Sequence, residues 1–213
     1  MKRRVGVLIS GRGSNLAALL RAAADPTWPA EIALVLSNRP DAAGLGIATE
    51  AGIATEVIDH RPFHGDRAAH EDRLLASLAA ADVEIVCLAG YMRLLTPHFV
   101  SPYAGRLLNI HPSLLPAFPG LDTHARALAA GVRLHGCTVH LVTEALDAGP
   151  ILAQAAVPVL PGDTEATLAA RVLVQEHILY PLALRAFIEG AAIPPPAGAA
   201  LLNPLPAPAA PTL

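Results

Sequence analysis

Short, continuously apolar runs alternate along this chain with longer segments in which apolar residues recur every three or four positions. Apolar runs of this length predict strands that are buried on both faces, and the period of 3.6 predicts helices between them. The expected strands are residues 5–10, 32–37, 55–58, 83–88 and 106–110, and the expected helices are 15–24, 42–51 and 66–80. Ser14 is the expected N-cap of the first helix, and Gly52 is expected to end the second. The alternation predicts an α/β, Rossmann-like fold, with a mostly parallel sheet and helices on both faces.

The alternation of strands and helices changes after Gly120. A helix is expected over 123–130, then strands over 137–142 and 151–157 that are joined by TEALDAGP. This connection is too short for a crossover helix, so the two strands are expected to pair antiparallel at one edge of the sheet. The last helix is expected over 164–189, interrupted or kinked at Tyr180 by Pro181. We therefore expect one domain over 1–189, followed by a Pro/Ala-rich tail over 190–213 that is loose or laid along the surface.

Composition narrows the class of protein. The chain has 213 residues, of which 53% are hydrophobic and 15% charged, which is enough apolar surface for a sizeable core. A net charge of −3 gives no basic surface for nucleic acid. The apolar run near the N-terminus is too short for a secretion signal, and prolines exclude a spanning helix in the tail. These features predict a cytoplasmic protein that binds neither membrane nor nucleic acid. They do not decide between a monomer and a homodimer.

Cysteine and histidine usage gives little sign of a metal site. Cys87 and Cys137 lie in apolar, strand-like runs and are expected to be buried core thiols. Neither has the spacing of a metal ligand, and we expect no metal. Eight histidines outside the candidate site described below are expected mostly at the surface or behind a site: His60, His64, His70, His98, His124, His135, His140 and His177.

The loop SGRGSN joins the first expected strand to the first helix. A glycine turn at the start of a helix lets backbone N–H groups approach an anion, so a phosphate site with Gly13, Ser14 and Asn15 as contacts is expected. A turn that needs glycine for steric reasons alone is the alternative. Leu16 stands where the dinucleotide fingerprint needs a third glycine, and the only lysine is Lys2. The pattern therefore favours a phosphomonoester over NAD or ATP.

Two polar side chains leave the end of the fifth expected strand in LLNIHPSLLPAFPG. Asn109 and His111 are two residues apart on an extended segment, so they point to the same side, and Pro112 and Pro116 stiffen the chain after them. Asp147, in LDAGP, is a third candidate, because a carboxylate near His111 favours its protonated form. An imidazolium and an amide can stabilise an oxyanion, which suits acyl transfer without an enzyme nucleophile. Structural roles in a turn or a strand end remain the alternative for each.

At this point the motifs resemble a known family. NIHPSLLPAFPG, ISGRGSNL, LAGYMRLL, HGCTVHLVTEALDAGPI and QEHILYP occur in order and together resemble the formyltransferases that use formyltetrahydrofolate, over about residues 5–188. Within that family they are most similar to the branch that formylates glycinamide ribonucleotide in purine synthesis. The resemblance implies direct transfer of a formyl group from 10-formyltetrahydrofolate, a co-substrate, to the amine of the ribonucleotide through a tetrahedral intermediate.

The resemblance also implies roles for individual residues. Asn109, His111 and Asp147 match the catalytic trio, with His111 as the acid. The residues that match ribonucleotide contacts are Gly13, Ser14, Asn15, Pro112 and Glu176. Those that match the folate pocket are Arg67, Met92, Arg93, Leu94, Leu95, Asn109, Thr143 and Asp147. No family pattern matches the tail.

Other functions on the same motifs stay open. A formyltransferase acting on methionyl-tRNA is expected to carry a basic RNA-binding domain after the core, and a formyltetrahydrofolate hydrolase a regulatory domain before it; neither pattern is present in this sequence. A sugar-nucleotide formyltransferase is disfavoured by the monophosphate-type loop. A non-catalytic module that binds a nucleotide or folate is the alternative from another class, and it has no need of the Asn109, His111 and Asp147 trio.

Overall fold

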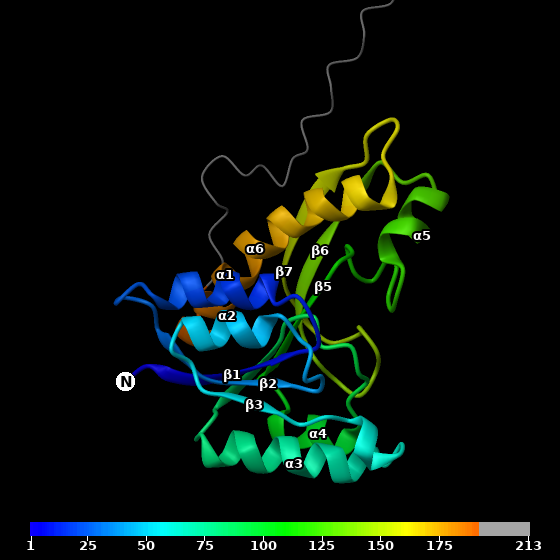
Figure 1. The fold of residues 1–213 in the computed structure, drawn as a ribbon. Coiled ribbons are helices and arrows are strands. Elements are labelled where there is room, and N and C mark those ends of the chain that lie inside the picture. Colours follow the sequence, from blue (N-terminus) through cyan, green and yellow to red (C-terminus); the bar gives the residue numbers. More distant parts are fainter. Residues whose placement is uncertain (192–213) are drawn as a thin grey trace, which may run out of the picture.

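Seven strands form one central sheet in the computed structural model, which describes residues 1–191 (Figure 1). The strands are β1 (Arg3–Ile9), β2 (Ala30–Ser37), β3 (Thr55–Val57), β4 (Ile85–Leu88), β5 (Leu107–His111), β6 (Leu134–Leu141) and β7 (Ile151–Pro158). Their order across the sheet is β3-β2-β1-β4-β5-β6-β7. The first five strands pair in parallel, whereas β6 pairs antiparallel with β5 and with β7. The predicted fold class and the antiparallel edge hairpin are confirmed.

Helices cover both faces of the sheet (Figure 1). The α-helices are α1 (Ser14–Ala23), α2 (Gly44–Glu50), α3 (Arg67–Ala80), α4 (Pro97–Val100), α5 (Thr123–Ala129) and α6 (Glu165–Glu189), with short 3₁₀ helices η1 (Arg61–Phe63) and η2 (Ser101–Tyr103). Helices α1, α2 and α6 lie on one face, and α3 and α4 lie on the other. The short helices α4, η1 and η2 were not expected from the sequence.

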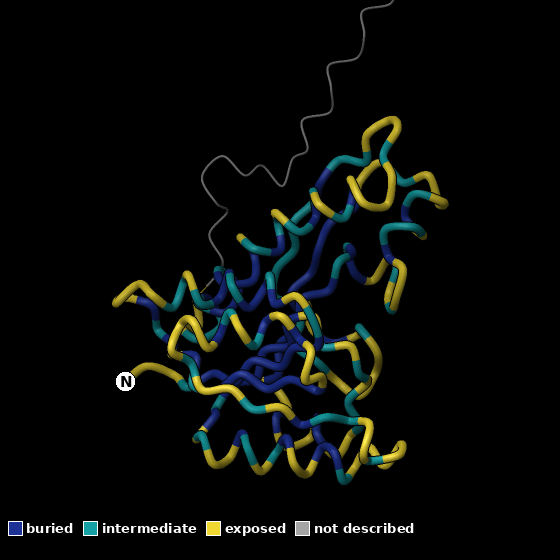
Figure 2. Tube along the Cα trace, in the orientation of Figure 1, coloured by how far each residue is buried: buried dark blue, intermediate teal, exposed yellow. Residues whose placement is uncertain are grey.

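Two apolar cores result, one on each face, and the inner strands β1, β2, β4, β5 and β6 between them are mostly buried, whereas the edge strands β3 and β7 are not (Figure 2). Leu16, Leu19 and Tyr180 are fully buried on the α1–α6 side, and Leu74 and Phe99 on the α3–α4 side. Burial on both faces explains why the parallel strands read as unbroken apolar runs rather than as alternating ones.

Several predicted boundaries need correction. Gly13, not Ser14, is the N-cap of α1, since its left-handed backbone (φ 76°) makes the turn and Ser14 is already helical. Helix α2 begins two residues later than expected, at Gly44, and β6 begins three residues earlier, at Leu134. Strand β4 begins only at Ile85. Gly52 does follow the end of α2 with the expected positive φ of 73°.

Pro181 does not interrupt the last helix, which runs unbroken from Glu165 to Glu189. An interior proline costs an α-helix about 3 kcal/mol. Tyr180, Ala183 and Leu184 beside it are buried in the core, and tertiary packing of this kind outweighs a local helix defect. Gly190 ends the helix in a left-handed conformation. The predicted tail, from residue 192 onward, lies outside the described residues.

Both cysteines are free and buried, as predicted. Burial raises the pKa of the Cys87 thiol to about 12, which makes it an inert core side chain. Among residues 1–191, no helix combines the length and the apolar character needed to cross a membrane.

Candidate functional site

The candidate residues gather where parallel strands end. The strand order reverses between β1 and β4, and ligands in α/β sheets bind outside the carboxyl ends of strands at such a point. Ser10 follows β1, residues 89–96 follow β4, and His111 ends β5. The topology therefore brings the glycine loop, the segment around Met92 and the Asn109–His111 pair to one edge of the sheet.

The glycine loop is held by a close backbone contact with α2. A Cβ placed on Gly13 would lie 2.5 Å from the Cα of Gly44, and the N–H of Gly44 donates to the carbonyl of Gly11 at 3.0 Å. Glycine is therefore required at position 13 both by its positive φ and by this contact. No side chain caps the start of α1, and its first turn carries no acidic residue, so these backbone N–H groups remain available to an anion.

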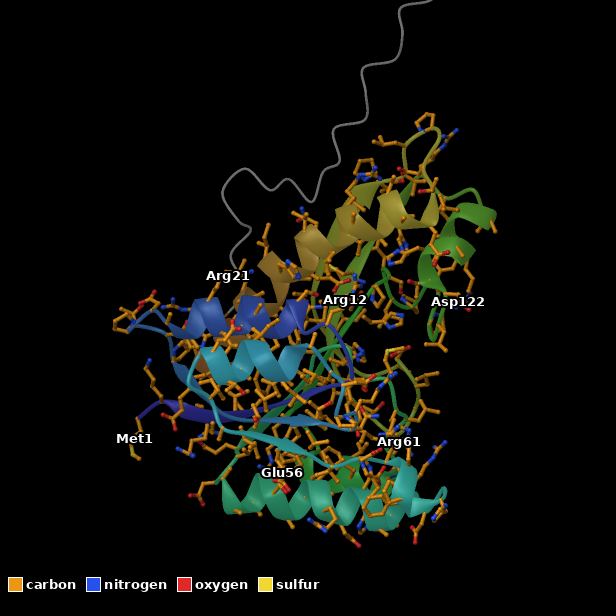
Figure 3. The ribbon with its side chains drawn as sticks, in the orientation of Figure 1. Met1, Arg12, Arg21, Glu56, Arg61 and Asp122 are labelled. Carbon is orange, nitrogen blue, oxygen red and sulfur yellow. The ribbon has the colours of Figure 1, made fainter. Side chains whose placement is uncertain are left out.

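Asn15 and Glu176 form a buried pair beside this loop. Asn15 Nδ2 donates to Glu176 Oε2 at 2.6 Å, although the two residues are 161 positions apart in the sequence. Burial raises the pKa of Glu176, an effect opposed by the Asn15 hydrogen bond and the charge of Arg12. Arg12 itself is exposed at the end of α1 that faces the β5–β7 part of the protein (Figure 3). The amide oxygen of Asn15 is buried and accepts no hydrogen bond from the described residues, which leaves one acceptor for a ligand.

The predicted trio comes together around His140, a histidine that the sequence pattern does not single out. His111 Nδ1 lies 3.5 Å from Asp147 Oδ2, while Asn109 Nδ2 lies 3.2 Å from His140 Nε2. His140 Nε2 is in turn 3.7 Å from Asp147 Oδ1. The side chains of His111, His140 and Asp147 are each less than a tenth exposed. Two imidazoles, an amide and a carboxylate thus form one buried polar cluster at the end of β5.

The turn that carries Asp147 is sterically specified. Asp147 adopts a positive φ of 49°, and the N–H of Gly120 donates to its Oδ2 at 2.8 Å. A Cβ on Gly149 would lie 1.8 Å from the carbonyl oxygen of Leu141, so only glycine fits there. The turn LDAGP therefore fixes the carboxylate against His111 rather than leaving it in solvent.

The second ring nitrogen of His111 is also occupied. His111 Nε2 lies 3.1 Å from the carbonyl oxygen of Phe118, in the loop after β5. The His111 ring therefore has a hydrogen-bond acceptor near each of its nitrogens, the carboxylate of Asp147 near Nδ1 and the carbonyl of Phe118 near Nε2. A ligand that accepts a hydrogen bond from Nε2 would compete with the Phe118 carbonyl.

Residues after β4 present exposed apolar surface beside the cluster. Met92 is 66% and Leu94 55% exposed. The N–H of Met92 donates to Ser10 Oγ at 2.8 Å, and Ser10 Oγ donates to Asn38 Oδ1 at 2.5 Å. The buried carboxylate of Glu71 accepts from the N–H of Thr96 at 2.8 Å. This segment is therefore anchored at both ends while its apolar side chains stay exposed.

Other predicted contacts are less closely tied to the cluster. Thr143 lies in the same β6–β7 connection as Asp147, with its hydroxyl donating to Ala145 O at 3.3 Å. Pro112 follows His111 and is half-buried. Arg67 is exposed at the first position of α3, and the structure gives it no contact with the trio.

Of the histidines expected at the surface or behind a site, three are buried: His70, His135 and His140 are at most 2% exposed. His140 lies behind Asn109, in line with that expectation, whereas His70 is buried against the carbonyl of Ile58. Burial lowers the pKa of His140, so it is uncharged at neutral pH. The only sequence signal for His140 was a polar residue within the apolar run CTVHLV, which is also typical of a structural histidine. Ser10, Asn38 and Gly44 were missed for the same reason, because each is recognisable only by its contacts.

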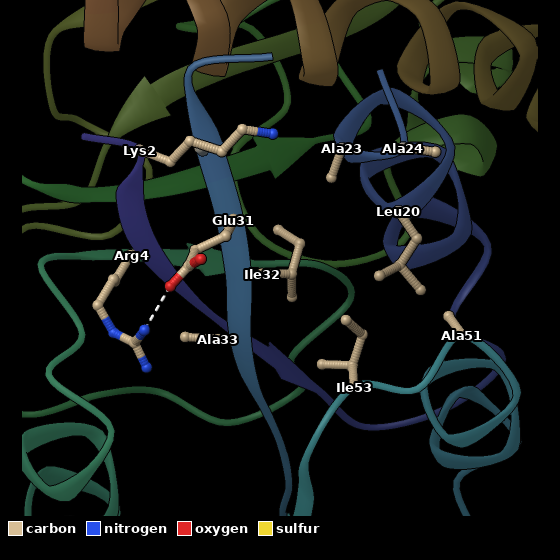
Figure 4. A pocket seen from close by; sticks show the side chains of 11 residues that line it. Lys2, Arg4, Leu20, Ala23, Ala24, Glu31, Ile32, Ala33, Ala51 and Ile53 are labelled. Atoms are coloured by element: carbon tan, nitrogen blue, oxygen red, sulfur yellow. Dashed lines mark hydrogen bonds and ion pairs between the residues drawn. The ribbon is translucent and has the colours of Figure 1, made fainter. Parts of the chain in front are cut away.

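A cavity of about 680 Å³ lies elsewhere, between α1, α2 and the beginning of β2 (Figure 4). It is lined partly by Lys2, Arg4 and Glu31, of which Arg4 and Glu31 form an ion pair. These residues belong to the amino ends of the strands, opposite the polar cluster. None of the candidate site residues lines it. Within residues 1–191, no group of three or more His, Cys, Asp and Glu is arranged to hold a metal ion.

Comparison with known proteins connects this geometry to a family. The profile of the formyl transferase family matches residues 3–184. Phosphoribosylglycinamide formyltransferase of Escherichia coli is 49% identical over 184 residues, which cover 86% of each chain. The crystal structure of the Brucella melitensis protein of that name is 61% identical with a TM-score of 0.84, covering 88% of this chain and 96% of that one.

Longer relatives match as well. The human trifunctional purine biosynthetic protein adenosine-3 is 48% identical over 189 residues, which are 89% of this chain and 19% of that protein. In the Drosophila melanogaster protein of the same name the match covers only 14% of its length. This chain therefore spans less than a fifth of these multifunctional relatives. The match along most of its own length, with the strand-end motifs in place, shows that the chain belongs to the formyl transferase family.

Proposed function

We propose that this protein transfers a formyl group from 10-formyltetrahydrofolate to the amine of glycinamide ribonucleotide, a step of purine synthesis. The observation that carries the proposal is the buried cluster of Asn109, His111, His140 and Asp147 at the carboxyl end of β5. The names of the relatives that match over most of their length support the same activity. A non-catalytic binding module has no use for a buried imidazole and carboxylate 3.5 Å apart.

The ribonucleotide is assigned to the glycine loop. Its phosphate would be bound by the uncapped N-terminus of α1 at Gly13, Ser14 and Asn15. Glu176, which already accepts from Asn15 at 2.6 Å, has a second carboxylate oxygen for a ribose hydroxyl. Pro112 lies directly after the catalytic strand, where it can border the amine. A monophosphate suits this loop because it offers one helix N-terminus and a single cation, Arg12, and lacks the lysine of a triphosphate-binding loop.

The folate is assigned to the segment after β4 and to the β6–β7 connection. The exposed side chains of Met92 and Leu94 offer apolar surface to a flat heterocycle, and Arg93, Leu95, Thr143 and Asp147 lie in the same two segments. Asn109 borders both substrates. Arg67 is kept as a candidate for the carboxylate-bearing end of the folate, because its exposed cation is free to move.

The chemistry follows from these positions. The amine attacks the formyl carbon, a C–N bond forms, and the electron pair of the C=O bond moves to oxygen. His111 and Asn109 donate hydrogen bonds to that oxygen. Asp147 supports the ring of His111 and helps to pass a proton, directly or through water, from the amine to the folate nitrogen. The electron pair on the oxygen then re-forms the C=O bond, the bond between the formyl carbon and the folate nitrogen breaks, and tetrahydrofolate leaves the formylated amine.

Residues 1–189 are proposed to act as one formyltransferase domain, working in the cytoplasm as a monomer or a homodimer with two small-molecule substrates. The alternatives are a formyltransferase or hydrolase with another acceptor, and a binding module. Sites for a metal or for nucleic acid form no part of the proposal.

A turnover assay separates these functions. Purified protein is mixed with 10-formyltetrahydrofolate, and folate absorbance is followed with and without glycinamide ribonucleotide. We expect turnover only with the ribonucleotide. Turnover without it would indicate a hydrolase, and binding of both ligands without turnover would indicate a binding module.

A further inference from the structure

His140 contributes a buried imidazole to the cluster, and each of its ring nitrogens has a defined neighbour. Its Nδ1 lies 3.0 Å from the carbonyl oxygen of Leu141, and its Nε2 lies 3.2 Å from Nδ2 of Asn109. The ring is 2% exposed, so water does not replace either partner. Asn109 and His140 are also direct partners in the β5–β6 pairing, which fixes the two side chains against each other.

The Leu141 carbonyl determines which nitrogen carries the proton. A carbonyl oxygen can only accept, so Nδ1 must be the donor. In a neutral ring Nε2 is then unprotonated and accepts from the Asn109 amide. The opposite amide orientation would place the Asn109 oxygen against the Nε2 lone pair, which loses a buried hydrogen bond and adds repulsion.

The charges around the ring are consistent with a neutral His140. Burial lowers its pKa, opposed by the Leu141 carbonyl and by Asp147, and the neighbouring His111 adds to the lowering. Asp147 Oδ1 is 3.7 Å from Nε2, beyond hydrogen-bonding distance, so the carboxylate does not hold a proton on that nitrogen. These are the ionisable groups that face the ring, one from the β6–β7 turn and one from β5.

We propose that His140 is a positioning residue for Asn109. The Leu141 carbonyl holds His140 as the Nδ1–H tautomer, and its Nε2 accepts one N–H of the Asn109 amide. The other N–H of that amide is then free for the formyl oxygen. The amide is thus fixed as an oxyanion donor before substrate binds. Protonation of His140 would remove the acceptor and release the amide. The inference rests on the proposed formyl transfer for its catalytic consequence, although the tautomer itself does not depend on it.

The first test uses the unaltered protein. Nitrogen chemical shifts of the ¹⁵N-labelled histidine rings distinguish the two neutral tautomers from the imidazolium, and His140→Gln assigns the signal. We expect a neutral Nδ1–H ring near pH 7.5, with or without substrates. An Nε2–H ring or an imidazolium at that pH would overturn the inference, whatever the turnover assay shows.

The second test measures turnover in a double-mutant cycle. His140→Leu removes the acceptor and is expected to lower kcat about 10- to 100-fold with little change in KM, because the misplaced amide acts mainly in the transition state. His140→Gln restores an oxygen acceptor near the Nε2 position and is expected to recover most of that loss. In an Asn109→Ala background, adding His140→Leu is expected to lower kcat further by less than about threefold, because His140 acts through Asn109.

His70→Leu is the matched control. It removes another buried histidine, on α3, whose ring bonds the carbonyl of Ile58 rather than Asn109. The effect of His70→Leu on kcat is expected to be independent of, and fully additive with, the effect of Asn109→Ala. If His140→Leu also added fully, His140 would act independently of Asn109 and the inference would be wrong. If His140→Leu fails to fold, His140→Gln decides the case: a kcat as low as that of Asn109→Ala would contradict an acceptor role. Absence of turnover in the wild type would refute the proposed function and leave the tautomer measurement standing.

Discussion

Asn15 Nδ2 and Glu176 Oε2 lie 2.6 Å apart and join the first helix to the last. The bond ties the glycine loop at the start of α1 to α6, and it is buried beneath the position proposed for the ribose. A charge-assisted hydrogen bond of this kind fixes geometry more strongly than a neutral one. The pair therefore connects the packing of α6 on α1 with the shape of the proposed nucleotide site.

Glu176→Gln is expected to raise the KM for the ribonucleotide about tenfold with a smaller change in kcat, since it weakens one hydrogen bond to a bound hydroxyl. Stability is not expected to fall. Burial raises the pKa of Glu176, so the stability linked to this group is present below the ordinary value of 4.5 and is lost as pH rises through the raised pKa. At neutral pH the amide removes a buried negative charge.

Steady-state kinetics and urea unfolding at pH 7.5 check both parts. Glu50→Gln, at an exposed position near the end of α2, serves as the control for a change of charge alone. An unchanged KM in Glu176→Gln would remove Glu176 from the proposed site.

His111→Ala is expected to lower kcat by about 10²- to 10⁴-fold while the protein stays folded. The imidazole is the group that bridges Asp147 and the proposed position of the formyl oxygen. Circular dichroism and the unfolding midpoint report folding, and single-turnover kinetics report the chemical step. Asp147→Asn, which keeps the shape of the turn, is expected to lower kcat in the same direction. Near-normal turnover in His111→Ala would be incompatible with its assigned role.

The sequence was sufficient to predict the architecture because the apolar runs report burial directly. Strands β1, β2 and β4 each contain an unbroken apolar run, and the short β6–β7 connection left antiparallel pairing as the only option. Boundaries were less accurate. Gly13 replaced Ser14 as the N-cap because the contact with Gly44 is made between segments thirty-one residues apart, and local propensity carries no information about it.

The trio proposed to be catalytic could be selected from the sequence for a similar reason. Asn109 and His111 stand out as polar residues at the end of a strand, followed by prolines. His140 did not stand out, since a lone polar residue inside a strand is more often structural, and its role depends on pairing opposite Asn109. The expected interruption at Pro181 does not occur, because the local cost of a helix proline is visible in the sequence, whereas the packing of Tyr180 and Leu184 that outweighs it is not.

Gly13→Ala is expected to destabilise the protein by about 2–4 kcal/mol, because a residue with a Cβ is strained in the left-handed conformation and because the new methyl group overlaps a neighbouring segment. The overlap is with the backbone of Gly44, at 2.5 Å, which cannot move away as a flexible side chain can. Binding of the ribonucleotide is expected to weaken, because displacement of α2 changes the loop that faces the phosphate.

Gly52→Ala separates the two effects. Gly52 has a similar φ of 73° but nothing within 4 Å of the added Cβ, so only the backbone cost of about 1 kcal/mol is expected there. Urea unfolding measures both variants, and calorimetry with the ribonucleotide measures binding. Equal destabilisation at the two positions would show that the contact with Gly44 is not tight in solution.

Acid sensitivity is expected from the buried histidines, with His135 the strongest case. Burial lowers the pKa of His135 to about 4, and the neighbouring His124 adds to the lowering. For a depressed folded-state pKa, stability is fully present above the unfolded value of about 6.5 and is lost as pH falls from there toward the folded value, by up to about 1–3 kcal/mol.

His135→Gln keeps a hydrogen-bonding partner for His124, which lies 3.1 Å away, but cannot be protonated. Urea unfolding between pH 8 and pH 4 should therefore show a shallower loss of stability in this variant than in the wild type. Some slope should remain, because burial also lowers the pKa of His70 and His140. Identical slopes in the two proteins would mean that His135 is protonated in the folded state as readily as in the unfolded chain.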